Sequence, residues 1–334
     1  MNAGDGAGRS GGARLTGALF ALAFAVLSIL PAGAEPLRLG HQSWLAPGPF
    51  FIARDKGWFA EEGVEVELVT VEDMANRAAA LATGKLDAMV AMVDATILHL
   101  TPKTELRFVF AVSDSRGADG LVATTDIETV AGLMGKRVAM APGSSGQFYL
   151  NVLLHEAGLN QSDVTIVPLA RGGAGHAFET GRVDAAVTWE PWLRRTREGR
   201  RGHVLADTSQ RPGLLIEAVV ARAETLQERT AEFAALYRAW QRAVVFAREN
   251  PEEADLIMAA GIGHWLRHPR IVTDMREGIA WYDGTANAAL FGEPGRPGPL
   301  AGTVGRAIEI WEGFGKLQVK REPRNLISYA VVGR

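Results

Sequence analysis

A glycine turn with two hydroxyl side chains is the clearest candidate for polar ligand binding. It has the sequence Pro142-Gly143-Ser144-Ser145-Gly146 and directly precedes a predicted helix over residues 147–157. Free N–H groups at a helix N-terminus bind anions or carbonyl oxygens. Capping of the helix by Ser144 or Ser145 would produce the same sequence without a ligand. Because the turn follows a predicted strand of an α/β pattern, where ligands bind, we favour ligand contact for Gly143, Ser144 and Ser145.

The tetrapeptide Trp189-Glu190-Pro191-Trp192 is a second candidate for binding. A tryptophan face can hold a planar or cationic group, and a glutamate can accept hydrogen bonds from an amine or amidine. The alternative is packing, with Trp192 buried under the next helix and Glu190 paired with Arg194 or Arg195. We include Trp189 and Glu190 among the predicted ligand contacts with this alternative open, and we expect Trp192 to be structural.

Arg171 favours an anionic ligand, in contrast to the cationic ligand that Glu190 favours. An arginine binds a sulfonate, carboxylate or nitrate through two parallel hydrogen bonds, although a solvated loop arginine is the simpler and favoured interpretation. Since Arg171 favours an anion and Glu190 favours a cation, the charge of the ligand stays open. Trp44 and Asp94 complete the predicted contacts, because each follows a predicted buried strand.

Several kinds of chemistry lack the residues they need. The chain contains no cysteine, which excludes thiol nucleophiles and thiolate metal sites. His264 and His268 have the spacing of a metal-binding pair but lack the glutamate of a zinc hydrolase, so we expect no metal. Gly173-Ala174-Gly175 lacks the third glycine of a dinucleotide site, and no Gly-x-Ser-x-Gly elbow or phosphate-loop lysine occurs. A net charge of −3 with interspersed signs argues against a nucleic-acid partner. We therefore expect a protein that is not an enzyme and that has no cofactor.

A repeated phrase organises the elements that must position these residues. Thr83-Gly84-Lys85-Leu86-Asp87-Ala88-Met89-Val90 returns 97 residues later as Thr180-Gly181-Arg182-Val183-Asp184-Ala185-Ala186-Val187. Each copy predicts a helix ended by a C-cap glycine and then a short buried strand. The predicted strands at 37–40 and 64–69 also return, 100 residues later. The sequence thus predicts two similar α/β lobes with a ligand cleft between them.

The chain is predicted to leave the first lobe once, to form the second lobe, and then to return to the first. We expect the first lobe over residues 35–116, the second over 117–213, and a return to the first lobe, with tail helices, over 214–334. A chain that leaves one lobe, builds the next and returns has two crossover strands. The predicted fold class is therefore α/β with two lobes and two crossover strands that form a hinge.

Residues 1–34 have the pattern of an export signal. Arg9 and Arg14 precede the apolar run 15–30, and Ala32-Gly33-Ala34 fits the small-x-small cleavage site of a secretory signal peptide. The alternative is an N-terminal membrane anchor, but the run is short for a membrane span and ends in a cleavage site. Because there is no cysteine for a lipid anchor, we expect an exported mature protein that is soluble.

Most of residues 36–255 carry motifs of a known family. In chain order these motifs are Ala53-Arg54-Asp55-Lys56-Gly57-Trp58-Phe59-Ala60-Glu61-Glu62-Gly63-Val64-Glu65-Val66, Gly84-Lys85-Leu86-Asp87-Ala88, Gly135-Lys136-Arg137-Val138, Gly143-Ser144-Ser145 and Gly181-Arg182-Val183-Asp184-Ala185. The chain resembles the periplasmic solute-binding proteins of ABC importers in the nitrate, sulfonate, taurine and thiamine-precursor family. The resemblance implies a two-lobed type II periplasmic binding protein fold, a small-molecule ligand, and an inner-membrane permease with its ATPase as partners. It also implies ligand contacts at Trp44, Asp94, Ser144, Ser145, Trp189 and Glu190.

Two other functions are compatible with this fold. A pyrimidine synthase of thiamine biosynthesis shares it, but its family depends on a cysteine-rich motif and this chain has no cysteine. An exported ligand sensor that feeds a receptor is the other alternative. The Trp-Glu pair favours a nitrogenous or heterocyclic solute over a sulfonate-like one, because few anion donors can be identified. We expect a monomer that closes on its ligand.

Overall fold

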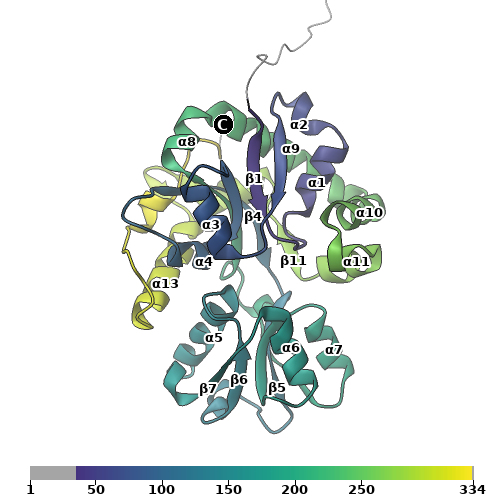
Figure 1. The fold of residues 1–334 in the computed structure, drawn as a ribbon, viewed down its shortest axis with the longest axis vertical. Coiled ribbons are helices and arrows are strands. Elements are labelled where there is room, and N and C mark those ends of the chain that lie inside the picture. Colours follow the sequence, from purple (N-terminus) through teal and green to yellow (C-terminus); the bar gives the residue numbers. More distant parts are fainter. Residues whose placement is uncertain (1–34, 333–334) are drawn as a thin grey trace, which may run out of the picture. The chain divides into compact units, whose positions relative to one another are not determined.

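Two β-sheets form the framework of the computed structural model, which describes residues 35–332 (Figure 1). The predicted signal peptide over residues 1–34 lies outside the described residues. The first sheet has the strand order β11-β4-β10-β3-β1-β2. Its strands are β1 (Leu37–His41), β2 (Val66–Thr70), β3 (Ala88–Met92), β4 (Leu106–Ser115), β10 (Ile216–Arg222) and β11 (Ile279–Trp281).

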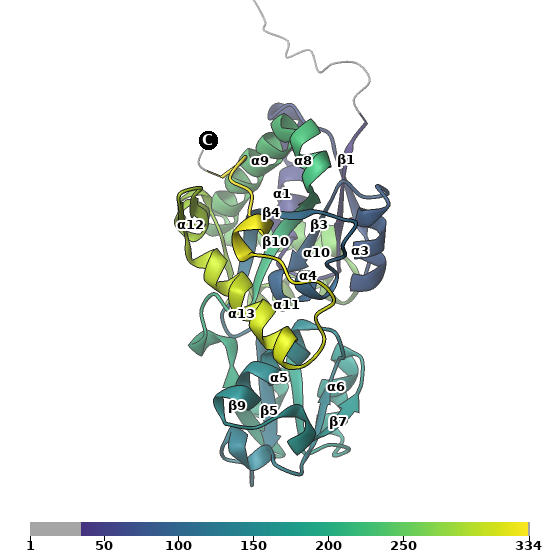
Figure 2. The ribbon, with the colours of Figure 1, turned by 90° about the vertical axis from the view of Figure 1, so that its left-hand side faces the viewer.

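The parallel strands β1, β2 and β3 end at the same edge of this first sheet. Helices α1, α9 and α10 lie on one face of the sheet, and α3, α4 and α13 lie on the other (Figures 1 and 2). The helices of this part are α1 (Gly48–Asp55), α2 (Trp58–Glu61), α3 (Met74–Ala82), α4 (Val93–Leu98), α8 (Ala223–Glu228), α9 (Thr230–Glu249), α10 (Pro251–Ile262), α11 (Pro269–Arg276), α12 (Gly284–Phe291) and α13 (Pro299–Gly313).

The second sheet repeats the parallel arrangement of the first. Its order is β7-β6-β8-β5-β9, with β6 parallel to β7 and β8, and with β5 antiparallel to β8 and β9. Its elements are β5 (Asp119–Thr124), β6 (Arg137–Met140), α5 (Ser145–Glu156), β7 (Thr165–Pro168), α6 (Arg171–Glu179), β8 (Ala185–Trp189), α7 (Trp192–Glu198) and β9 (Gly202–Asp207).

Short elements complete the described chain. They are β12 (Gly292–Glu293), β13 (Arg296–Pro297) and the 3-10 helices η1 (Val130–Leu133), η2 (Gln161–Asp163), η3 (Thr208–Gln210), η4 (His264–Leu266) and η5 (Pro323–Leu326). The C-terminal segment returns along the first sheet, where the Ser328 N–H donates to the Phe108 carbonyl at 2.9 Å (Figure 2). This contact fixes the segment beside β4.

Two crossovers connect the sheets, and Thr208 links them. The chain leaves β4 for β5 between residues 115 and 119, and it returns from β9 to β10 between residues 207 and 216. The buried Thr208 Oγ1 lies 2.7 Å from Ser115 Oγ, accepts the Gly117 N–H at 2.9 Å, and donates to the Asp119 carbonyl at 3.2 Å. The predicted two-lobed α/β class is confirmed. The predicted limits of the lobes at 116/117 and 213/214 stay predictions.

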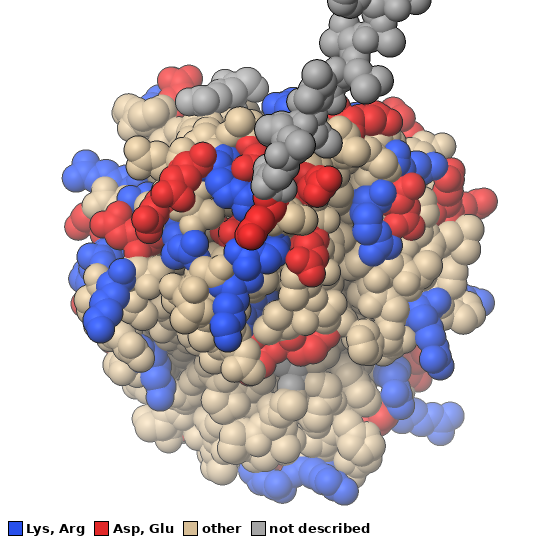
Figure 3. All heavy atoms as spheres, turned by 45° about the horizontal axis from the view of Figure 1, so that its top comes forward, with Lys and Arg blue, Asp and Glu red and all other residues tan. Residues whose placement is uncertain are grey.

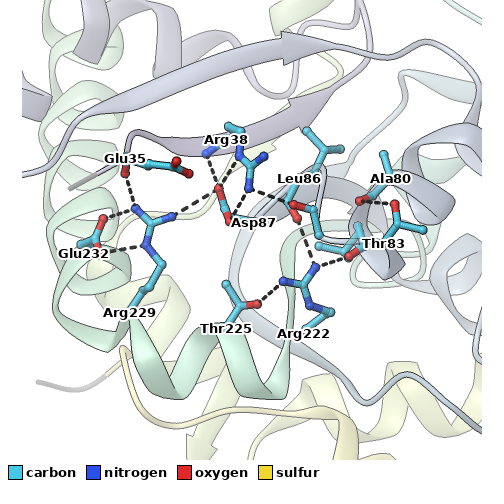
Figure 4. Close-up of polar contacts among 12 residues, drawn as sticks. Glu35, Arg38, Ala80, Thr83, Leu86, Asp87, Arg222, Thr225, Arg229 and Glu232 are labelled. Atoms are coloured by element: carbon cyan, nitrogen blue, oxygen red, sulfur yellow. Dashed lines mark hydrogen bonds and ion pairs between the residues drawn. The ribbon is translucent and has the colours of Figure 1, made fainter. Parts of the chain in front are cut away.

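The repeated phrase has the same structural role in both sheets. Asp87 accepts the Arg38 N–H at 2.9 Å with its carboxylate and donates its own N–H to the Arg38 carbonyl at 3.0 Å (Figure 4). Asp184 does the same with Arg137, at 2.8 and 3.0 Å. Each aspartate therefore joins the start of the third strand of its lobe to the start of the first.

The glycine and the apolar residue of the phrase also have equivalent surroundings. Gly84 and Gly181 end their helices with φ of 75° and 80°, a left-handed conformation that glycine adopts without strain. The carbonyl of Leu86 accepts a hydrogen bond from Arg222, and the carbonyl of Val183 accepts one from Arg201. In both lobes the third strand begins directly after the aspartate of the phrase, β3 at Ala88 and β8 at Ala185.

The surface carries charges of both signs. Figure 3 shows Lys and Arg interspersed with Asp and Glu on the face it presents. Ion pairs link neighbouring helices, as where Glu62 of the α2 end pairs with Arg238 and Arg242 of α9 at 2.7 and 3.0 Å. Within residues 35–332, no helix is long and apolar enough to cross a membrane.

Candidate functional site

A cavity of about 480 Å³ opens at the carboxyl ends of β1, β2 and β3. Residues of the first sheet and its helices line one side, among them Gln42, Glu72, Arg77 and His99. The turn after β6 lines the other side with Gly143, Ser144 and Ser145. The glycine turn predicted from the sequence therefore faces the strand ends of the other lobe, as a ligand cleft requires.

Three consecutive residues after β1 connect the site internally. Gln42 donates from Nε2 to Glu217 of β10 at 3.1 Å. Ser43 donates its N–H and its hydroxyl to Glu72, which follows β2. Trp44 packs edge-to-face against Trp189 of β8, with ring centroids 6.2 Å apart. This loop thus holds two carboxylates on the first-lobe side and meets the second lobe through an aromatic contact.

A direct polar contact also joins the two sides of the cleft. Ser145 donates its hydroxyl to Asp94 Oδ1 at 3.1 Å, and both residues are buried. Asp94 belongs to α4, where its carbonyl accepts the indole N–H of Trp311 at 2.9 Å. Ser145 is the first residue of α5. The contact therefore ties the N-terminal turn of α4 to that of α5.

The two serines of the glycine turn have different roles. Ser144 is the N-cap of α5, since its hydroxyl accepts the Gly146 N–H at 3.1 Å and donates to the Ala141 carbonyl at 2.7 Å. Gly143 has a φ of 69° and donates its N–H to Gln147 at 2.8 Å. Capping accounts for Ser144, whereas the hydroxyl of Ser145 reaches across the cleft.

Trp189 and Glu190 point to different surroundings. Trp189 is the last residue of β8 and contacts Trp44. The carboxylate of Glu190 accepts the Arg194 N–H at 2.9 Å and a guanidinium hydrogen of Arg197 at 2.7 Å, at the start of α7. The structure therefore places Trp189 against Trp44 of the first lobe, while Glu190 is engaged by the helix that follows it.

Trp192 has the packing role expected of it. Its ring lies against His176 at a centroid distance of 6.1 Å and under the Arg195 guanidinium at 4.7 Å. A Cβ on Gly175 would come within 2.4 Å of this ring, so the glycine is needed for the close approach of α6 and α7. Arg171, predicted in a loop, is the first residue of α6, and its side chain lies outside what the structure describes.

Burial shifts the pKa values of one arginine and two histidines at or beside the cavity. Burial lowers the pKa of Arg77, and attraction to Glu217 and Glu72 offsets part of that shift. Burial also lowers the pKa of His41 and of His99, so both imidazoles are neutral at neutral pH. The guanidinium of Arg77 donates to the carbonyls of Val71 and Glu72 rather than to a carboxylate.

Sequence reasoning missed Gln42, Arg77 and Glu217. Glu217 interrupts the apolar run Leu214–Ala221, and a charged residue inside a buried strand is itself a signal of function. It is 1% exposed. Gln42 lies only two residues before the predicted Trp44, but a single glutamine in a loop carries no sequence signal. Arg77 resembled an ordinary exposed residue of an alanine-rich helix.

Other features of the described residues do not compete with this site. A cavity of about 600 Å³ lies beside α12 and the β12–β13 hairpin, away from the carboxyl ends of the parallel strands. In residues 35–332 no group of three or more His, Cys, Asp or Glu could hold a metal ion. His268 instead accepts the Arg270 N–H at 3.3 Å as the cap of α11.

The family of the chain follows from a sequence comparison. A family model described as "NMT1/THI5 like" matches residues 46–254, which is more than half of the chain. The chain belongs to the NMT1/THI5-like family. The NMT1/THI5-like match contains every predicted ligand contact except Trp44, which lies two residues before it.

Individual relatives are binding proteins by name. A Bacillus subtilis (strain 168) protein, named as a candidate aliphatic sulfonates-binding protein, is 30% identical over 226 residues, 66% of this chain and 68% of that protein. The crystal structure of the periplasmic aliphatic sulphonate binding protein SsuA from Escherichia coli has a TM-score of 0.73 at 19% identity, covering 90% of this chain and 100% of that one. The structural likeness establishes the periplasmic binding protein fold.

The same fold also carries an enzyme. The crystal structure of the desulfurization enzyme DSZB has a TM-score of 0.60 at 15% identity, covering 87% of this chain and 96% of that one. Since the fold serves both binding proteins and an enzyme, the residues of the cleft must decide the function of this NMT1/THI5-like chain.

Proposed function

We propose that the protein is the periplasmic solute-binding component of an ABC importer and captures one small organic solute in the cleft. The observation that carries this proposal is the contact of Ser145 with Asp94 across the polar cavity. Two similar lobes that meet through such a contact, and that the chain connects by two crossovers, match a protein that closes on its ligand. The named relatives support a solute-binding role.

The proposed mechanism is capture by closure. A solute that touches both lobes favours the closed arrangement by the difference between its affinities for the closed and open states. Thr208 and its partners hold the two crossovers together, so closure would pivot about this point. The turn of Ser145 and the ring of Trp189 would approach the first lobe together, because α5 and β8 both belong to the second lobe.

We favour a nitrogenous or heterocyclic solute over a sulfonate-like one. Glu72, Glu217 and Asp94 place carboxylates around the cleft, and carboxylates accept hydrogen bonds from amines and amidines. The sulfonate alternative is supported by the name of the Bacillus subtilis relative, by the N-terminus of α5, and by Arg77, whose Nε has no hydrogen-bond partner among the described residues.

Two variants test which charged residue, Glu190 or Arg171, binds the charged group of the ligand. Glu190→Gln removes a negative charge with little change in shape, and Arg171→Gln removes a positive charge but keeps a polar side chain. Loss of affinity for an amine in Glu190→Gln would place Glu190 in the site, and loss of affinity for a sulfonate in Arg171→Gln would place Arg171 there. Unchanged affinity in either variant removes that residue from the site.

We propose binding without turnover, with an enzyme on this fold as the alternative. The likeness to DSZB motivates that alternative, while the absence of cysteine removes the motif on which the related pyrimidine synthase depends. An exported ligand sensor is the third candidate. We further propose cleavage of residues 1–34 on export, a monomeric mature protein, and delivery to an inner-membrane permease with its ATPase.

A thermal-shift screen tests the proposed function. The purified mature protein is heated with benzamidine, choline, cytosine, nicotinamide, taurine, methanesulfonate and nitrate in turn. A ligand at 100 times its dissociation constant adds about 2.7 kcal/mol to the free energy of unfolding, which raises Tm by several degrees. Mass spectrometry of the recovered probe then separates binding from turnover. A chain that no probe stabilises, or a probe that is consumed, would contradict the proposal.

A further inference from the structure

Trp265 extends the aromatic contact between Trp44 and Trp189 to a third ring. The Trp265 and Trp44 ring centroids lie 6.1 Å apart with the planes tilted by 38°, while Trp44 also meets Trp189 edge-to-face. Trp44 is buried, but Trp265 leaves 39% of its surface exposed. We call Trp44, Trp189 and Trp265 the tryptophan cluster. Trp44 covers part of the Trp265 ring, and 39% of the residue is exposed to solvent.

The backbone around Trp265 holds its ring in this place. Gly263 and His264 both have positive φ, 66° and 51°, and a positive φ is uncommon for a residue other than glycine. The next two side chains then go to different surroundings. Leu266 is fully buried and anchors η4 in the core, whereas Trp265 lies on Trp44. The backbone therefore directs the Trp265 ring onto Trp44.

The segment that carries Trp265 also contacts the second lobe. Residues 263–276, which we call the lip, contain η4 and α11. Asp274 of α11 forms an ion pair with Arg194 of α7. The hydroxyl of Thr273 donates to the buried Asp255 of α10 at 2.6 Å, which ties α11 to the first lobe. The lip thus reaches from the first lobe to the helix that follows Trp189 and Glu190.

We propose that Trp265 is a ligand-contacting residue that, with Trp44 and Trp189, holds the planar or cationic part of the solute. This inference rests on the proposed solute-binding function and adds a chemical class to it. Aromatic faces attract cations and stack on planar groups, and a well-packed tryptophan contributes strongly to binding. The carboxylate of Glu217, which Gln42 contacts from the same loop as Trp44, would complement the positive charge of such a solute.

The first test needs no ligand. The chain contains eight tryptophans, so protein grown with 5-fluorotryptophan gives a small set of ¹⁹F resonances that single Trp→Phe variants assign. Trp265→Phe should move the Trp44 resonance, because the ring currents of the two residues act on each other. Trp58→Phe is the matched control, since Trp58 packs on Phe246 at 5.7 Å and not on the cluster. A Trp44 resonance that does not respond to Trp265→Phe would overturn the inference.

The second test measures affinity with benzamidine, choline and methanesulfonate. Trp265→Ala should weaken the binding of benzamidine or choline at least tenfold, Trp265→Phe should recover most of the loss, and Leu256→Ala on the exposed surface of α10 should have no effect. A Trp265→Ala protein within twofold of the wild type overturns the inference. Binding of methanesulfonate alone, unchanged in Trp265→Ala, overturns it but leaves the solute-binding function intact. Failure of the wild type to bind any of these probes or the thermal-shift panel overturns both.

Discussion

Asp87→Asn tests the structural role of the repeated phrase, because it removes one charge and keeps the shape of the side chain. The carboxylate accepts the Arg38 N–H at 2.9 Å and the Arg38 guanidinium at 3.0 and 3.1 Å, and it lies 3.3 Å from the Arg229 guanidinium (Figure 4). Breaking a buried ion pair costs about 3–5 kcal/mol. The Arg38 side chain is 32% exposed and can be solvated when freed, so we expect a loss of about 2–3 kcal/mol.

The second copy of the phrase supplies a matched control. Asp184 accepts only the Arg137 N–H among the contacts that the structure describes, and an asparagine oxygen can still accept that hydrogen. We expect Asp184→Asn to cost less than about 0.5 kcal/mol, because this hydrogen bond is kept. Urea unfolding at pH 7, with equal m-values, measures both losses. Equal losses in the two variants would refute the assignment of an ion-pair role to Asp87.

The same pair of variants predicts a pH dependence. Burial alone would raise the pKa of Asp87, but hydrogen bonds from Arg38 and attraction to Arg38 and Arg229 outweigh it and lower the pKa. A carboxylate with a lowered pKa stabilises the fold fully above its unfolded pKa of about 3.9, and this stabilisation disappears as the pH falls through the folded value. The difference between wild type and Asp87→Asn should therefore be constant from pH 6 to 8 and shrink below about pH 4. A difference that grows on acidification would contradict the lowered pKa of Asp87.

Three further substitutions probe the crossovers and the cleft. Thr208→Val should lower the free energy of unfolding by about 1–3 kcal/mol because it leaves the Gly117 N–H without its acceptor, while Thr180→Val at an exposed helix end should cost less than about 0.5 kcal/mol in the same urea titration. Asp94→Ala and Ser145→Ala should show a coupling of about 0.5–1.5 kcal/mol in a double-mutant cycle on ligand affinity, and additive effects would mean that their contact does not help to close the cleft. Glu217→Gln should reduce the affinity for benzamidine more than that for nicotinamide, measured by calorimetry, and an equal reduction would rule out recognition of the ligand charge by Glu217.

The fold could be predicted because its signals are local and repeated. The C-cap glycines Gly84 and Gly181 adopt the left-handed conformation that the sequence predicts. Asp87 and Asp184 occupy equivalent positions, so the register of the repeat carried over to the structure. The phrase could not reveal the partners of its aspartates, since Arg38 precedes Asp87 by 49 residues and Arg137 precedes Asp184 by 47.

The site was harder to predict because its contacts join distant segments. Ser144 and Ser145 look alike in the sequence, but only the structure assigns capping to one and the contact with Asp94 to the other. Glu190 stood out beside two tryptophans, yet a helix N-terminus and an arginine occupy its carboxylate. Trp265 lies more than 200 residues from Trp44, in a segment where the resemblance to the family has faded, and no periodicity connects the two.

Titration calorimetry with the most stabilising probe of the panel, followed by mass spectrometry of the recovered probe, tests the central claim most directly. Capture of one solute in a closing cleft predicts one site per chain, a negative heat-capacity change from buried apolar surface, and a probe recovered unaltered. Asp94→Ala should weaken that binding, because Asp94 joins the two sides of the cleft. A chemically altered probe, or binding that Asp94→Ala leaves unchanged, would contradict the account.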